Sequence, residues 1–252
     1  MNKPVFKLNQ LASAAALGLA LVGGAQAGAG IQIISRDAAG VGFNDLTPAE
    51  PVGGNPGTTI GEQRRNVYER VAAYWASKLD NVVPVTVSAG WEALTCTATS
   101  AVLGSAGAWN GYYDFPNIPV ANTWHGAALA NKLAGSNLSE GVPDDGTGYG
   151  NVDIKSQFNI NLGSATCLTG SGWYLGFDHN HGTNIDFSIT LLHELGHGLG
   201  FQTFTNGSTG AQLNGLPAAW DRFLVDNSTG KNWVQMTATE RQASALAGNH
   251  LV

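Results

Sequence analysis

Residues 193–197 read HELGH, and this segment constrains the chain more than any other. Apolar residues recur around it at helical spacing, which predicts an amphipathic helix over residues 187–198. Its expected buried stripe consists of Ile189, Leu192, Leu195 and Leu199. Its candidate N-caps are Asn184 and Asp186. Gly198 and Gly200 end the helix, because glycine tolerates the left-handed exit from a helix.

The spacing of the two histidines has a chemical reason. His193 and His197 lie four residues apart, so one helical turn brings both imidazoles within reach of a single metal ion. Glu194 lies on a neighbouring strip of the same turn, where it can take a proton from a metal-bound water without becoming a ligand. The sequence therefore predicts one catalytic zinc ion on His193 and His197, with Glu194 as general base.

The longer segment 193–201, HELGHGLGF, resembles the zincin metallopeptidases. Gly200 is similar to the glycine of the metzincin pattern HExxHxxGxxH. The Trp-Asp-Arg-Phe-Leu segment at 220–224 has a weaker similarity to secreted bacterial peptidases. The resemblance implies an α+β zincin-like domain, with a twisted sheet and a long helix above the active-site helix and a cleft between them. It also implies a zinc-dependent endopeptidase that acts on protein or peptide substrates.

The sequence departs from the metzincin pattern at the third zinc ligand, because Thr203 occupies the position of the third histidine. A catalytic zinc ion needs three protein ligands and a water. We predict Asp221, an isolated carboxylate after an apolar segment, which would resemble the aspzincins in ligand set. Met236 agrees with this order, since metzincins place a methionine turn after the third ligand. His250 is the alternative, because leishmanolysin-like enzymes place their third histidine far downstream. Asp226 in a turn and Glu240 in the first turn of a helix are weaker alternatives.

The N-terminus predicts export. Lys3 and Lys7 precede an apolar stretch over residues 11–24, and a small-x-small pattern ends at Ala27. This is typical of a signal peptide over residues 1–27, and the stretch is too short to be interpreted first as a membrane span. An uncleaved anchor is the alternative. We expect a mature domain over residues 28–252, secreted or periplasmic, with no membrane contact after cleavage. The last residues resemble the start of a strand, so a truncated chain is one interpretation.

Composition narrows the partners. A net charge of −6 argues against nucleic acid and anionic membranes. Only 12% of the residues are charged while Gly contributes 34, which suits a loop-rich extracellular protein. We expect one domain and a monomer. Cys96 and Cys167 predict one disulfide in an oxidising compartment, and a two-cysteine metal site is the alternative without CxxC support.

Other elements follow from periodicity. The predicted helices are 59–79, 124–133 and 239–247, the last capped by Thr237 or Thr239. The predicted strands are 30–35, 82–88, 96–103 and 153–162. Pro84 places the second of these at an edge or at a strand start. Residues 104–122 show no clean periodicity, and 220–225 predicts a strand or a short helix. The alternating strand 153–162 is our candidate for the upper edge of the cleft, where a peptide can add as a further strand.

Three further groups are weaker candidates. Residues 178–181 (DHNH) suggest a second metal or a substrate contact, although a solvated loop is the simpler explanation. Residues 144–146 with Asp153 suggest a calcium-binding loop, but their spacing matches no EF-hand. Tyr149 or Tyr174 is a candidate donor to an oxyanion.

Two other function classes remain open. One is an extracellular binding module that keeps a zincin scaffold without turnover, which the threonine at position 203 favours. The other is a zinc amidase acting on cell-wall peptides. The carboxylate of Glu194 favours catalysis over the binding module, since it has little reason to stand beside a structural zinc.

Overall fold

The computed structural model describes residues 30–80, 82–141 and 151–251. Its main sheet contains four strands in the order β1-β2-β8-β5. They are β1 (Ile31–Ser35), β2 (Val85–Glu92), β8 (Ile154–Asn159) and β5 (Gly104–Ala108). The first three run parallel, and β5 pairs antiparallel with β8 at one edge. Together with the helices, this sheet confirms the α+β class.

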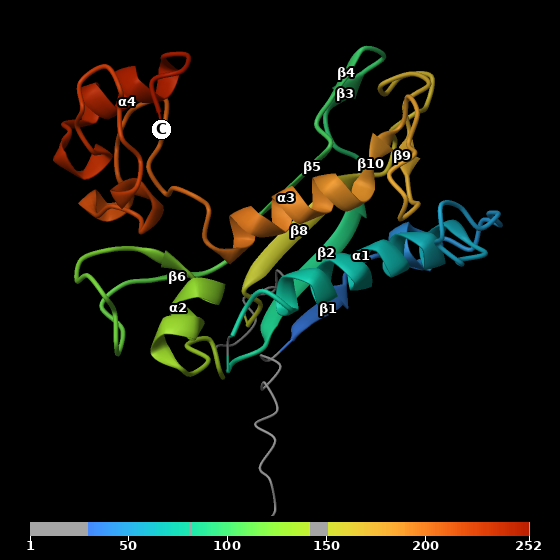
Figure 1. The fold of residues 1–252 in the computed structure, drawn as a ribbon, viewed down its shortest axis with the longest axis horizontal. Helices are drawn as coiled ribbons and strands as arrows, with labels where there is room; N and C mark the ends of the chain where they lie inside the picture. Colours follow the sequence, from blue (N-terminus) through green and yellow to red (C-terminus); the bar gives the residue numbers. More distant parts are fainter. Residues whose placement is uncertain (1–29, 81, 142–150, 252) are drawn as a thin grey trace, which may run out of the picture.

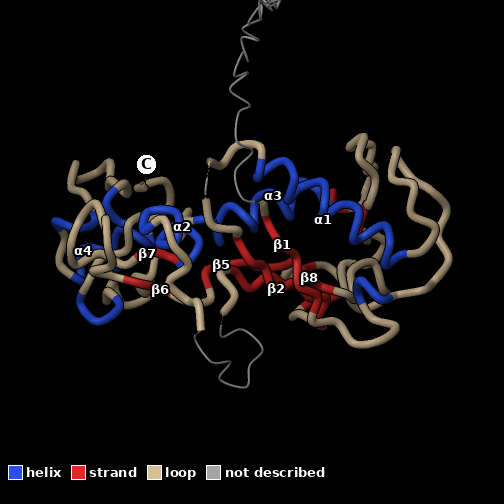
Figure 2. The backbone as a smooth tube through the Cα atoms, turned by 90° about the horizontal axis from the view of Figure 1, so that it is seen from below, coloured by secondary structure: helices blue, strands red, loops and turns tan. Residues whose placement is uncertain are grey.

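Two helices lie side by side on one face of the sheet (Figures 1 and 2). They are α1 (Ile60–Ala76) and α3 (Phe187–Leu199). The core between the helices and the sheet is rich in aromatic rings, and Tyr68 and Phe187 both lie against Phe158 of β8. Two shorter α-helices also occur in the described part of the chain: α2 (Ala127–Ala134) and α4 (Ala238–Leu246). Among the described residues, no helix is long and apolar enough to cross a membrane.

Local sequence explains where the two long helices begin. Thr59 and Glu62 form a capping box at the start of α1, in which each side chain bonds the backbone of the other residue. Asp186 caps α3 by accepting a hydrogen bond of 3.1 Å from the backbone of Ile189. Gly198 lets α3 approach the sheet, since a Cβ there would lie 2.5 Å from the side chain of Ile154. These features confirm the helix predicted over residues 187–198 and select Asp186 from its two candidate caps.

The buried stripe of α3 differs from the predicted one. Phe187, Leu191 and Leu195 face the core, whereas Ile189 is 56% exposed and Leu192 is half-buried. The prediction was wrong for Ile189 and omitted Phe187 and Leu191, whereas Leu195 is buried as expected and Leu192 and Leu199 pack partly buried against the core. The helix packs on the sheet through the strip that ends at Gly198, while Ile189 and part of Leu192 line the surface that carries the histidines.

The strand predictions need two corrections. Residues 153–162 were expected at the edge of the cleft, but β8 lies inside the sheet between β2 and β5. The edge is β5, which lies within the segment that shows no clean periodicity. Its sequence, GSAGA, offers no apolar alternation, because its residues are small. Val85–Glu92 is also an interior strand, and Pro84 precedes it, which agrees with the predicted strand start.

Short strands form three small hairpins or ladders beside the main sheet. They are β3 (Cys96–Thr97) with β4 (Ser100–Ala101), β6 (Gly111–Tyr112) with β7 (His125–Gly126), and β9 (Trp173–Tyr174) with β10 (Ile185–Asp186). The predicted strand 96–103 is therefore mostly a hairpin that leads into β5. The predicted disulfide is confirmed: Cys96 and Cys167 are bonded, with Cα atoms 5.1 Å apart. It ties this hairpin to the segment that follows β8.

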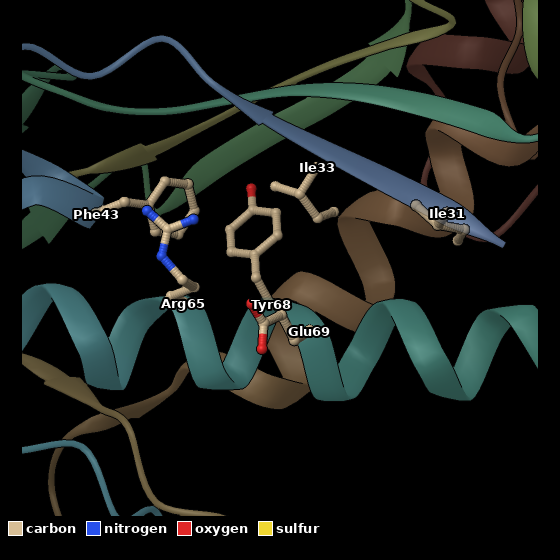
Figure 3. Close-up of a pocket in the computed structure, with 6 residues that line it drawn as sticks. All are labelled: Ile31, Ile33, Phe43, Arg65, Tyr68 and Glu69. Carbon is tan, nitrogen blue, oxygen red and sulfur yellow. The ribbon is translucent and has the colours of Figure 1, made fainter.

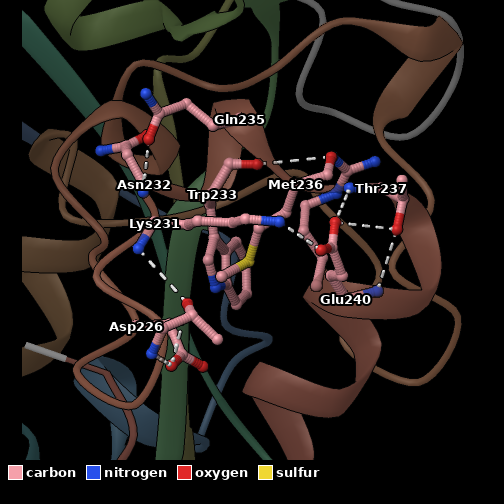
Figure 4. Close-up of polar contacts among 10 residues, drawn as sticks. Asp226, Lys231, Asn232, Trp233, Gln235, Met236, Thr237 and Glu240 are labelled. Atoms are coloured by element: carbon pink, nitrogen blue, oxygen red, sulfur yellow. Dashed lines mark hydrogen bonds and ion pairs between the residues drawn. The ribbon is translucent and has the colours of Figure 1, made fainter.

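The residues after α3 gather beyond its C-terminal end, coloured orange to red in Figure 1. Residues 220–225 begin with a 3₁₀ helix, Trp220–Arg222, which agrees with the short-helix alternative. Thr237 caps α4, and Glu240 accepts a hydrogen bond of 2.7 Å from the backbone of Thr237 (Figure 4). Lys231 pairs with the same carboxylate. Side-chain caps thus organise a segment that contributes little to the main core.

Candidate functional site

His193 and His197 meet on the surface of α3. Their Nε2 atoms lie 3.0 Å apart, and the rings are nearly perpendicular. The Nδ1 atom of His197 lies 2.7 Å from the carbonyl oxygen of Phe201. A carbonyl only accepts, so Nδ1 carries the proton and the Nε2 lone pair of His197 faces His193. The two rings therefore present their Nε2 atoms to the same point in space.

This arrangement fits a metal ion. Two nitrogens bound at about 2.0–2.1 Å to a tetrahedral zinc ion are about 3.3 Å apart, close to the spacing of the two Nε2 atoms. The bond from Nδ1 of His197 to a carbonyl is the kind of contact that orients metal-binding histidines. Across the described ranges, no third His, Cys, Asp or Glu joins the two histidines to make a metal-binding group.

Glu194 points to the free edge of the sheet. Its Oε2 atom accepts a hydrogen bond of 3.0 Å from the backbone N–H of Ala106 in β5. The backbone N–H of Asn159 donates a hydrogen bond to the carbonyl oxygen of Leu103, and the N–H of Trp109 donates one to the carbonyl oxygen of Asp153. The backbone N–H and C=O groups of the odd-numbered residues in this stretch therefore face β8. The N–H of Ala106 therefore points away from the sheet. The carboxylate predicted as general base lies where the sheet ends.

A second side chain bonds the same edge. The Oε1 atom of Gln202, just after α3, accepts a hydrogen bond of 3.1 Å from the N–H of Ala108. Sequence reasoning gave no role to Gln202 and left β5 unassigned. The only available signal was position: Gln202 follows the turn at Gly200, whose φ is 135°.

The histidines line a hollow of about 450 Å³ with otherwise apolar walls. Trp75 of α1 contributes to it, as do Ile189, Leu192 and Phe201. The indole of Trp75 donates to the carbonyl oxygen of Leu192 at 3.3 Å, which joins α1 to the wall. The exposed apolar face of α3 therefore surrounds the histidines.

Another hollow, of about 200 Å³, lies between β1 and α1 (Figure 3). Its lining residues are Ile31, Ile33, Phe43, Arg65, Tyr68 and Glu69. Tyr68 points from α1 toward β1, and its hydroxyl shares a hydrogen bond of 2.8 Å with Ser156. None of its lining residues belongs to the histidine cluster. The two converging histidines therefore line the larger of these two hollows.

Asp221 is fully buried, and its carboxylate has three protein donors. Thr205 donates through its hydroxyl at 2.6 Å, and the backbone N–H of Ala218 donates at 2.9 Å. The third donor is the hydroxyl of Thr203. The structure thus joins Asp221 to the residue at the position where a third histidine was sought, and not to His193 or His197.

The other candidates for the third ligand lie in the C-terminal segment. The Nδ1 atom of His250 lies 3.6 Å from a carboxylate oxygen of Asp226. Asp226 also accepts hydrogen bonds from Ser228 and Thr229, as a turn residue does, and hydrogen bonds from Ser228 and Ser244 hold its pKa well below the usual range. Figure 4 shows Asp226 near Lys231, in the same segment as Met236. The side chains of His250 and Asp226 therefore lie beside each other in the C-terminal segment.

The side chains of the other candidate site residues contact nearby protein groups. His179 lies 2.7 Å from Asp186, the cap of α3, and His181 lies 2.8 Å from the carbonyl oxygen of Asn184. Tyr174 donates to Asp178, a bond that raises the pKa of Tyr174 to about 12. Asp153 is buried against Thr86 and Asn131, and burial raises its pKa. The expected calcium residues 144–146 and Tyr149 lie outside the described residues.

Comparison with known proteins adds no relative, because no family model, curated protein or solved structure matches the chain.

Proposed function

We propose that this chain is a secreted zinc-dependent endopeptidase of the zincin type. The observation that carries the proposal is the convergence of two imidazoles on one face of α3, with a carboxylate on the residue next to the first of them. Two Nε2 atoms meet at 3.0 Å, and the adjacent carboxylate of Glu194 reaches the sheet edge. The sheet, α1 and α3 are the elements that the sequence resemblance implies, although α3 packs directly on the sheet and the histidine hollow lies on its outer face.

His193 and His197 would hold the zinc ion. We propose Asp221 as the third ligand, with His250 as the alternative. Asp221 would have to exchange its hydrogen bond with Thr203 for the metal, and His250 would have to leave Asp226. A bound zinc ion lowers the pKa of its water to about 7 and polarises a carbonyl oxygen.

The remaining residues position the substrate and move a proton. The outward N–H of Ala106 is a backbone donor at a sheet edge, where an extended peptide can add as a strand. The carboxylate of Glu194 lies at the same edge and would take the proton of the attacking water, then pass it to the leaving amine. The hollow around His193 places apolar side chains on one side of the site.

The test compares the exported chain from residue 28 with two variants. We expect about one zinc per chain and hydrolysis of casein. Glu194→Gln should keep the zinc and lose at least a hundredfold in rate, because it removes the general base. His193→Ala should lose both zinc and activity. A folded wild-type chain that binds no zinc contradicts the proposal. Hydrolysis of peptidoglycan fragments without casein would favour the amidase class.

A further inference from the structure

A third hollow, of about 220 Å³, lies beyond the C-terminal end of α3. Its side chains come from α2, from the end of α3 and from the 3₁₀ helix Trp220–Arg222 and the residues beside it. They are Leu129, Leu199, Phe201, Ala219, Trp220 and Phe223. All are apolar, and we refer to this group as the aromatic hollow. Phe201 and Phe223 are 53% and 69% exposed, so large apolar surface remains in contact with water.

The aromatic hollow adjoins the histidine hollow. Phe201 lines both of them, and its ring lies 5.0 Å from that of Trp220. The carbonyl oxygen of Phe201 also holds Nδ1 of His197. One residue thus connects the aromatic wall to a proposed metal ligand. Exposed apolar patches on soluble proteins commonly mark binding sites, and this patch is continuous with the site already described.

The bonds at the sheet edge give the direction of a bound peptide. The backbone N–H of Ala106 donates to Glu194 of α3, and that of Ala108 donates to Gln202, which follows α3. The later residue of β5 thus pairs with the later residue of the helix segment, so β5 runs in the same direction as α3. Antiparallel pairing is the more stable kind, and a peptide that pairs so with β5 runs from the C-terminal end of α3 toward its N-terminal end. The amino-terminal side of the peptide then lies at the aromatic hollow.

We infer that the aromatic hollow is a specificity subsite for one large, uncharged apolar side chain on the amino side of the scissile bond. This inference rests on the proposed endopeptidase function. The volume of the hollow exceeds the roughly 150 Å³ of an engineered cavity that binds benzene, so a phenyl ring fits. Among the residues that the structure describes, no charged side chain lines the hollow, and a charged substrate residue would lose its hydration there without a partner.

The experiment uses quenched fluorescent peptides that differ at single positions on the amino side of the cleaved bond, with Phe, Ala or Glu there. The wild-type chain should cleave the Phe peptide about tenfold or more faster, in kcat/KM, than the Ala peptide. Phe223→Ala should remove most of this preference, so that the Phe and Ala peptides are cleaved at similar rates. Leu246→Ala is the matched control, because Leu246 is also 69% exposed but lies on α4.

A second variant, Ala219→Leu, fills the hollow from its wall and should slow the Phe peptide selectively. Equal cleavage of the Phe and Ala peptides by wild type, or an equal loss for both in Phe223→Ala, would overturn the inference. If the wild-type chain cleaves no peptide, the proposed function fails, and the inference is then tested by measuring how tightly the chain binds the peptides. Calorimetry should then show tighter binding of the Phe peptide, lost in Phe223→Ala, and equal binding would overturn it.

Discussion

The hydroxyl of Thr203 donates a hydrogen bond to the buried carboxylate of Asp221. The residue that replaces an expected zinc ligand is therefore joined to the residue proposed as its substitute. Since Asp221 also accepts from Thr205 and from the backbone of Ala218, it organises the loop that leaves α3.

We expect Asp221→Ala to destabilise the fold by about 3 kcal/mol, because it leaves a buried N–H and two hydroxyls without an acceptor. Asp221→Asn retains an acceptor and should lose less. Urea unfolding measures both, and the zinc content of the same samples separates two roles. Zinc lost from a well-folded Asp221→Asn would support ligation by Asp221, whereas zinc retained would assign it a structural role. An Asp221→Ala chain as stable as wild type would contradict the buried network.

Zinc should raise the melting temperature of the wild-type chain, since a ligand that binds only the folded state stabilises it. His197→Ala should abolish this shift, because it removes one of the two converging nitrogens. The matched control is His181→Ala, whose ring bonds the carbonyl oxygen of Asn184. Thermal unfolding with and without zinc, after removal of metal by a chelator, makes the comparison. A shift that survives in His197→Ala would place the metal elsewhere.

Gly198→Ala should destabilise the chain by about 1–3 kcal/mol, because the new methyl group would overlap the side chain of Ile154 in a closely packed core. Gly196→Ala is the control on the same helix. A Cβ at Gly196 would meet Trp75 at 3.6 Å, an ordinary contact, so this change should be neutral or stabilising. Denaturant unfolding compares the two, and equal effects would argue against the close approach of α3 to β8.

Reduction of the disulfide should lower the free energy of unfolding by about 2–4 kcal/mol, since Cys96 and Cys167 are 71 residues apart and the bond restricts a long loop in the unfolded chain. The double variant Cys96→Ser/Cys167→Ser should reproduce this loss and should not change when reductant is added. Urea unfolding with and without reductant tests both. A loss under reductant in the double variant would point to another cause.

Acid should weaken the C-terminal segment. Hydrogen bonds from Lys231 and from the backbone and hydroxyl of Thr237 lower the pKa of Glu240 to about 2 from an ordinary 4.5. A lowered carboxyl pKa gives stability that is complete above pH 4.5 and lost as the pH falls toward 2. Glu240→Gln should therefore be less stable than wild type at pH 7, and the difference should shrink in acid. Fluorescence of the buried Trp233 reports this unfolding, and a difference that is constant with pH would contradict the assignment.

The sequence predicted the elements whose signals are local. Thr59 with Glu62 and Asp186 identify helix starts through side-chain caps, and the spacing of His193 and His197 identifies one helical face. The strand β5 escaped prediction because its small residues form a strand only by pairing with β8.

Two features of the site depend on tertiary contacts and could not be predicted from the sequence. Ile189 was placed in the core because an apolar residue at helical spacing does not reveal whether a hollow adjoins it. The partner of Asp221 depends on how the loop after Gly200 folds back, and no local pattern specifies that path.

The hydrogen bond between Glu194 and Ala106 has a consequence for the order of events. A peptide that pairs with β5 must take the N–H of Ala106 for its own carbonyl, and the carboxylate must then give up this donor. In the free protein the carboxylate is thus kept occupied by the edge that would receive the substrate. Binding of a peptide backbone to β5 would therefore free the carboxylate of Glu194 from this hydrogen bond. Without a peptide, the carboxylate proposed as proton acceptor would stay bonded to Ala106.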